Sequence, residues 1–86
     1  MSVRSFEIYP DPNDGTFTVE IQSTSLTSVH LSVTDILGRV VFDHSESGVS
    51  GTWRRQIDLD GGNASGIYFV HLTTRNGYLL RKVVKR

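Results

Sequence analysis

The C-terminal stretch of the chain, residues 66–86, constrains the fold more than any other part of the sequence. It contains two β-rich runs that are separated by Asn76-Gly77. Such a pair is typical of a two-residue β-hairpin, because a type I′ turn needs a positive φ at both central residues. The sequence therefore predicts that the chain ends in an antiparallel hairpin with Arg75 opposite Tyr78.

Side chains in a hairpin alternate between two faces, and here the two faces differ in character. One face begins with three large apolar groups, Tyr68, Val70 and Leu72, so we assign it to the core. We expect Arg81, Val83 and Lys85 to share that face. The opposite face mixes apolar and basic side chains, namely Ile67, Phe69, His71, Thr73, Leu80, Lys82 and Val84. Its candidate partner-binding residues are Phe69, His71, Lys82 and Val84.

Shorter segments upstream show the same period-two alternation. In residues 16–22 every second side chain is apolar, which is typical of a half-buried antiparallel strand. Two polar segments rich in serine or glycine, 23–28 and 45–51, are expected to be loops. Trp53 is expected to cap one end of the core. No segment has the pattern of a helix.

The predicted fold class is all-β, an immunoglobulin-like antiparallel β-sandwich of about seven strands without the cysteine pair of antibody domains. A five- or six-stranded barrel is the alternative. A chain of 86 residues buries only about 60 to 65% of its unfolded surface, so residues 1–86 are expected to form a single domain. The strands are expected to begin near residues 3, 16, 29, 39, 52, 66 and 78.

The charge balance argues against some classes of partner. Nine basic and nine acidic residues cancel, so no global field attracts nucleic acid or an anionic surface. The chain has no cysteine and hence no disulfide and no thiolate metal site. Four of the last six residues are basic, and on a final edge strand such a cluster also serves to block sheet-to-sheet association.

The sequence shows no set of residues that would support catalysis or hold a cofactor. The three histidines lack metal-ligand spacing, and no serine lies in a nucleophile elbow. Residues 11–15 do not continue as a calcium loop, and the glycine-rich segment 60–66 is not followed by the lysine of a phosphate-binding loop. Asp58 and Asp60 are interpreted as turn residues. We therefore expect no enzyme activity, no cofactor and no metal.

Five short blocks of the sequence stand out, and together they resemble one family. They are Tyr9-Pro10-Asp11-Pro12-Asn13-Asp14-Gly15 leading to Phe17, Thr34-Asp35-Ile36-Leu37-Gly38-Arg39-Val40-Val41, Ile57-Asp58-Leu59, Ser65-Gly66-Ile67-Tyr68 and Arg81-Lys82-Val83-Val84-Lys85-Arg86. In this order they resemble the C-terminal sorting domain of the type IX secretion system, type A, over residues 6–86. In the first block Asp11 stands where the family usually has asparagine, and the two residues form similar turns.

This resemblance implies a domain at the C-terminal end of a larger exported protein from the Bacteroidetes group. Such a domain directs its N-terminal cargo from the periplasm across the outer membrane, to the cell surface or the medium. The implied partners are the secretion translocon and a sortase-like protease that usually removes the domain. Residues 1–4 do not resemble a secretory signal, so the export signal is expected to lie outside this chain. The candidate sorting signal is Gly66, Tyr68, Lys82, Val83, Val84, Lys85 and Arg86.

The residues themselves suggest how such a signal works, and they leave alternatives open. A last strand at a sheet edge would offer free backbone groups and basic ends for strand addition or for an acidic groove on the translocon. The same edge would permit self-association. The competing hypothesis is a non-catalytic accessory module, fibronectin-like or carbohydrate-binding, at the end of a secreted enzyme. Such modules usually expose a row of aromatics, and here mainly Phe69 and Tyr78 face outward. A purely structural spacer is the third hypothesis.

Overall fold

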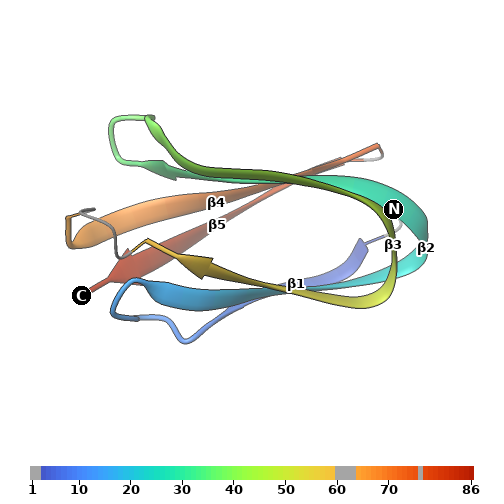
Figure 1. Cartoon of the computed structure of the whole chain (residues 1–86), viewed down its shortest axis with the longest axis horizontal. Helices are drawn as coiled ribbons and strands as arrows, with labels where there is room; N and C mark the ends of the chain where they lie inside the picture. The colour runs from blue at the N-terminus through green and yellow to red at the C-terminus, as the bar shows by residue number, and fades with distance from the viewer. Residues whose placement is uncertain (1–2, 60–63, 76) are drawn as a thin grey trace.

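The computed structural model describes residues 3–59, 64–75 and 77–86, and this part of the chain is built from five β-strands (Figure 1). All strand pairs are antiparallel. No helix long and apolar enough to cross a membrane occurs in these ranges. The strands are β1 (Val3–Tyr9), β2 (Thr16–Asp35), β3 (Val40–Asp58), β4 (Gly66–Thr74) and β5 (Gly77–Lys85).

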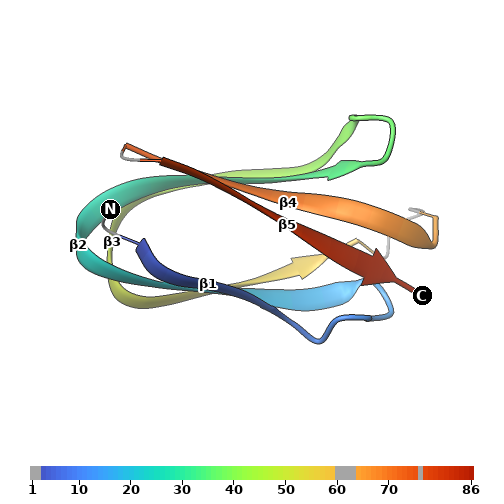
Figure 2. The ribbon, with the colours of Figure 1, turned by 180° about the vertical axis from the view of Figure 1, so that it is seen from behind.

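Two strands, β2 and β3, are long enough to pass through both layers of a sandwich (Figure 1, Figure 2). The first half of β2 pairs with β1, and its second half pairs with β4, which in turn pairs with β5. Strand β3 follows β2 along both halves. One layer therefore holds β1 with half of β2 and β3, and the other holds the remaining halves with β4 and β5. The predicted all-β antiparallel sandwich is confirmed.

The strand count is lower than the predicted seven because two predicted loops belong to the long strands. Residues 23–28 lie within β2, and residues 45–51 lie within β3. The chain bends there without leaving the sheet, since the pairing shifts register on either side of Thr27. Gly48 and Gly51 adopt φ angles of 73° and 68°, which glycine tolerates. The serine and glycine content that suggested loops instead permits bent strands.

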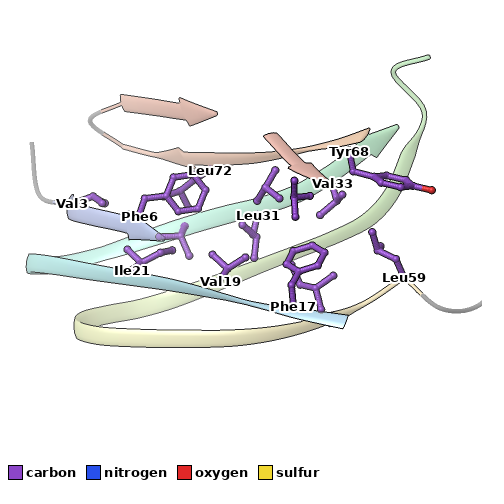
Figure 3. Packing of buried hydrophobic residues seen from close by; sticks show 14 of the residues in the cluster. Val3, Phe6, Phe17, Val19, Ile21, Leu31, Val33, Leu59, Tyr68 and Leu72 are labelled. Atoms are coloured by element: carbon purple, nitrogen blue, oxygen red, sulfur yellow. The ribbon is translucent and has the colours of Figure 1, made fainter. Parts of the chain in front are cut away.

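The core lies between the two layers and follows the alternation seen in the sequence (Figure 3). Along the first half of β2, Phe17, Val19 and Ile21 are at most 1% exposed. Full burial of each such side chain stabilises the folded state by about 1.5 to 3 kcal/mol relative to leaving it exposed. Trp53 is half-buried and packs against the core from β3, where it stacks on His44 with ring centroids 6.4 Å apart. The other core residues are Val3, Phe6, Val29, Leu31, Val33, Val49, Ile57, Leu59, Tyr68, Val70, Leu72 and Val83.

The terminal hairpin forms as predicted, but its register differs from the predicted one by two residues. Thr74 pairs with Gly77. We expected Arg75 opposite Tyr78, and that detail is wrong. A shift of two leaves every side chain on its predicted face, so the hydrophobic pattern cannot distinguish the two registers. The predicted turn residue Asn76 lies outside the described residues.

The predicted core face of β5 is buried only in part. Val83 is 1% exposed and lies in the core. Arg81 is exposed and Lys85 is half-buried, although the alternation places both on this face. Strand β5 is the last strand of its layer. A long basic side chain at such a position packs its apolar stem inward and keeps its charged end at the surface; the guanidinium of Arg81 lies against the ring of Phe6.

Candidate functional site

The outer face of the β4–β5 hairpin brings together the four residues that we predicted to bind a partner. Phe69 lies directly opposite Lys82, and His71 and Val84 occupy neighbouring positions on the same face. Ile67, Tyr78 and Leu80 also lie there, with 40%, 55% and 45% of their surface exposed. The surface is therefore wider and more apolar than the four predicted residues alone. The hairpin face, as we call it, consists of Ile67, Phe69, His71, Tyr78, Leu80, Lys82 and Val84.

His71 is held in one orientation at the centre of this face. Its Nε2 atom lies 2.8 Å from the hydroxyl oxygen of Thr34, and its Nδ1 atom lies 2.6 Å from the hydroxyl oxygen of Tyr78. A hydroxyl either donates or accepts a hydrogen bond, so both ring nitrogens are satisfied. Thr34 belongs to β2, the neighbour of β4. The hairpin face is thus anchored to the rest of its layer by side chains as well as by backbone pairing.

An apolar groove of about 650 Å³ opens at the end of the sandwich, beside the start of β4. One wall is the tip of the β2–β3 hairpin, where Ile36 and Leu37 are 69% and 75% exposed. The other wall is formed by residues 64–68. Ile67 lines this wall and also belongs to the hairpin face, so the two surfaces are continuous. We call this groove the end groove. It was not predicted from the sequence, because its only sequence signal was the pair of consecutive aliphatic residues Ile36 and Leu37.

The charges that line the end groove neutralise each other. Oδ1 of Asp35 accepts hydrogen bonds from the backbone N–H groups of Leu37 and Arg39 at 2.9 and 3.0 Å. Oδ2 accepts one from Nε of Arg39 at 2.7 Å. Burial alone would raise the pKa of Asp35, but the hydrogen bonds from Arg39 and Leu37 outweigh it and hold the pKa below its ordinary value. Between these two walls the groove presents mainly aliphatic side chains and a paired ion couple.

The predicted sorting-signal residues divide into a buried and an accessible group. Tyr68 and Val83 are 4% and 1% exposed, so in the folded domain they build the core. The Tyr68 hydroxyl also donates a hydrogen bond to the carbonyl of Ala64, which fixes the chain entering β4. Gly66 begins β4 with a φ of 142° and pairs with Lys85. The accessible members are the exposed Gly66, Lys82 and Arg86 and the half-buried Val84 and Lys85.

The turn that follows β1 contacts the end of β5, a relationship that sequence reasoning missed. Oδ1 of Asp11 accepts a hydrogen bond from the backbone N–H of Val84 at 3.0 Å. The N–H of Asn13 donates to the Val84 carbonyl at 3.0 Å. The Asn13 carbonyl accepts from the N–H of Arg86 at 2.6 Å. Strand β5 lies at a sheet edge as expected, but the expectation that its backbone groups are free is wrong at Val84, because the turn occupies them.

The residues considered for catalysis or metal binding do not converge. His30 is bonded to Asp43, and His44 to Glu46, at separate places on β2 and β3. Within residues 3–59, 64–75 and 77–86 no group of three or more His, Cys, Asp or Glu residues is arranged to hold a metal ion. Asp60, considered as a partner of Asp58, lies outside the described residues.

These features describe a small β-sandwich domain with a surface that mixes exposed apolar and basic side chains. The family model of the secretion system C-terminal sorting domain matches residues 7–86, and the chain belongs to this family. The resemblance drawn from the five sequence blocks is thereby confirmed. The domain is a C-terminal sorting signal of the type IX secretion system: it is attached to a cargo protein, interacts with the secretion machinery and directs export to the cell surface or the extracellular space. No curated protein matches the chain, and nothing favours the accessory-module hypothesis.

Proposed function

We propose that the secretion machinery reads the hairpin face together with the basic end of β5. The observation that carries this proposal is the direct pairing of Phe69 with Lys82 on an exposed face bordered by aliphatic side chains. Protein partners bury aromatic and aliphatic groups at the centre of an interface and meet charged groups at its rim. Lys85 and Arg86 lie at the end of the same strand, where they would attract an acidic region of the translocon.

The end groove is the place where apolar side chains of the same machinery insert. Two observations support this assignment. The groove joins the hairpin face through Ile67, and the ion pair between Asp35 and Arg39 leaves its walls without a net charge. A volume of about 650 Å³ gives room for a few apolar side chains of a partner. A mainly aliphatic groove whose two charges already pair with each other favours an apolar occupant, since a further buried charge would remain unpaired there.

The route of export belongs to this proposal as well. The attached cargo and the folded domain reach the periplasm first, and the translocon then carries both across the outer membrane. A sortase-like protease removes the domain at the cell surface. Membership of the sorting-domain family supports this sequence of events.

The proposal is tested by export of a reporter protein fused ahead of the domain, in a bacterium that has this secretion system. Deleting residues 82–86 is the direct test, but it also removes the core residue Val83. A loss of export by this deletion could then result from unfolding as well as from lost recognition. Exposed side chains avoid this problem. One variant combines Lys82→Gln with Arg86→Gln, and a second combines Ile36→Ser with Leu37→Ser.

Each variant is expected to lower the amount of reporter at the cell surface and in the medium several-fold, with the reporter retained in the periplasm. The matched control combines Arg4→Gln with Arg75→Gln, which removes two exposed basic groups outside the hairpin face. The control should export like the wild type. Undiminished export by both test variants would reject the proposal.

A further inference from the structure

Three sequence blocks that are far apart in the chain meet at the end of β5. In an antiparallel ladder, successive residues direct their backbone groups to opposite sides of the strand. Val84 directs its N–H and C=O groups to the open edge, where Asp11 and Asn13 bind them. Lys85 is paired on the other side with Gly66. The last residues of the chain are therefore held from both sides, although β5 is an edge strand.

The turn that holds Val84 is itself fixed by internal hydrogen bonds. Oδ1 of Asn13 accepts a hydrogen bond from the N–H of Gly15 at 2.8 Å, and its Nδ2 donates to the carbonyl of Pro10 at 3.1 Å. The carbonyl of Gly15 accepts the N–H of Leu59 at 2.7 Å, which ties the turn to the chain just after β3. Asn13 is only 1% exposed. The turn is thus attached to the sandwich by contacts that do not involve β5.

We infer that Asp11 and Asn13 are positioning residues of the sorting signal, which hold the end of β5 in the orientation that the secretion machinery reads. This inference rests on the function proposed above. The last residues of a domain are poorly ordered unless other groups tie them down. A partner that must order a frayed tail loses affinity, whereas a tail that is already ordered avoids that cost. The signal is then a composite of turn and tail, and its parts lie 73 positions apart between Asp11 and Val84.

The contact between Asp11 and Val84 requires an acceptor oxygen and does not require a negative charge. Asparagine carries an acceptor Oδ1 at the same position of the side chain, and alanine carries none. Asp11→Asn should therefore preserve the contact, and Asp11→Ala should abolish it. This pair of substitutions separates a hydrogen bond from a general effect of charge. The matched control is Glu7→Ala, which removes an exposed carboxylate on β1.

The test compares these variants in the same reporter fusion by two measurements. Amide hydrogen exchange reports how firmly the tail is held, and reporter at the cell surface and in the medium reports sorting. In Asp11→Ala, the Val84 amide is expected to exchange about five- to tenfold faster and export to fall by a similar factor, as the loss of about one net hydrogen bond implies. Asp11→Asn and Glu7→Ala should match the wild type in both measurements. All comparisons are made where the amide of the core residue Leu31 remains protected.

Each outcome either supports or overturns the inference. The inference is supported if Asp11→Ala speeds exchange of the Val84 amide and lowers export, and Asp11→Asn restores both to the wild-type values. If Asp11→Ala exports normally while Lys82→Gln with Arg86→Gln does not, the inference is overturned and the proposed function stands. If Asp11→Asn fails as badly as Asp11→Ala, the hydrogen bond is not the cause and the inference is overturned. Normal export by every variant, including Ile36→Ser with Leu37→Ser, rejects the proposed function itself.

Discussion

The guanidinium group of Arg81 lies over the aromatic ring of Phe6, with its central carbon 5.4 Å from the ring centroid. Phe6 belongs to β1 and Arg81 to β5, which are the two ends of the strand path β1-β2-β4-β5. These two strands are not paired by their backbones in the described sheet. A cation and an aromatic ring therefore link the two layers at the side of the sandwich where strand pairing does not.

Replacing Arg81 by methionine should lower the free energy of unfolding by about 0.5 to 1 kcal/mol, the range found for cation–π contacts at exposed sites. Urea unfolding measures this change. A double-mutant cycle with Phe6→Leu isolates the contact, because the effect of Arg81→Met should shrink once the ring is gone. Fully additive effects of the two substitutions would contradict the assignment.

Tyr68→Phe should destabilise the domain only modestly, by about 0.5 to 1.5 kcal/mol, because it removes one hydrogen bond to Ala64 and keeps the buried ring. Export should be unchanged at temperatures where the variant is folded. Tyr68→Ala should cost about 3 to 5 kcal/mol and impair export by unfolding. Failure of export by a folded Tyr68→Phe domain would show instead that the hydroxyl group is read directly.

Gly66→Ala should lower the free energy of unfolding by about 1 to 3 kcal/mol. The reason is backbone strain, since a φ of 142° is unfavourable for alanine while the space around the position is open. Urea unfolding of Gly66→Ala and of the neighbouring control Ser65→Ala gives the comparison. A Gly66→Ala domain as stable as the control would mean that the backbone relaxes there at no cost.

Stability should decline in acid in part through Glu20. Its Oε1 atom accepts hydrogen bonds from the Tyr9 hydroxyl at 2.8 Å and from Nε of Arg54 at 2.7 Å. The bond from Tyr9, followed by that from Arg54, lowers the pKa of Glu20 below its ordinary value of 4.5. The folded state thus binds fewer protons than the unfolded state, so the contribution is complete above pH 4.5 and is lost as the pH falls through the folded pKa.

The measurement is the free energy of unfolding as a function of pH for the wild type and for Glu20→Gln. The free energy of unfolding of the variant should depend less on pH below pH 4.5, which is the ordinary pKa of the Glu20 carboxyl group. Asp14→Asn, which removes a carboxylate that is 87% exposed and lies outside β1 and β2, is the control and should follow the wild type. Identical curves for Glu20→Gln and the wild type would contradict the assigned hydrogen bonds.

The strands and their faces were predictable because alternation is a local property of the sequence. Phe17, Val19 and Ile21 are buried as their spacing indicated. The hairpin face was predictable for the same reason. The predicted register was wrong by two residues, but the residues on the face were still correct, because side chains return to the same face every two residues. The bends near Gly48 and Gly51 were not predictable, since the same residues are found in loops and in bent strands.

The contacts between distant blocks could not be read from the sequence. Asn13 satisfies the requirements of a turn by itself, and nothing in the sequence shows that its backbone also binds Val84 and Arg86. The end groove likewise depends on the β2–β3 hairpin tip lying beside residues 64–68. In the sequence, Ile36 and Leu37 stood out only as part of one of the five family blocks. Both features arise from tertiary packing, which local patterns do not encode.

Strand β1 begins towards one end of the longest axis of the domain, which extends over 36 Å, and β5 ends towards the other (Figure 1). The tail of β5 and the β2–β3 hairpin tip lie together at this second end. A partner that binds the end of β5 and the hairpin tip therefore leaves the start of β1 at the opposite end of the domain.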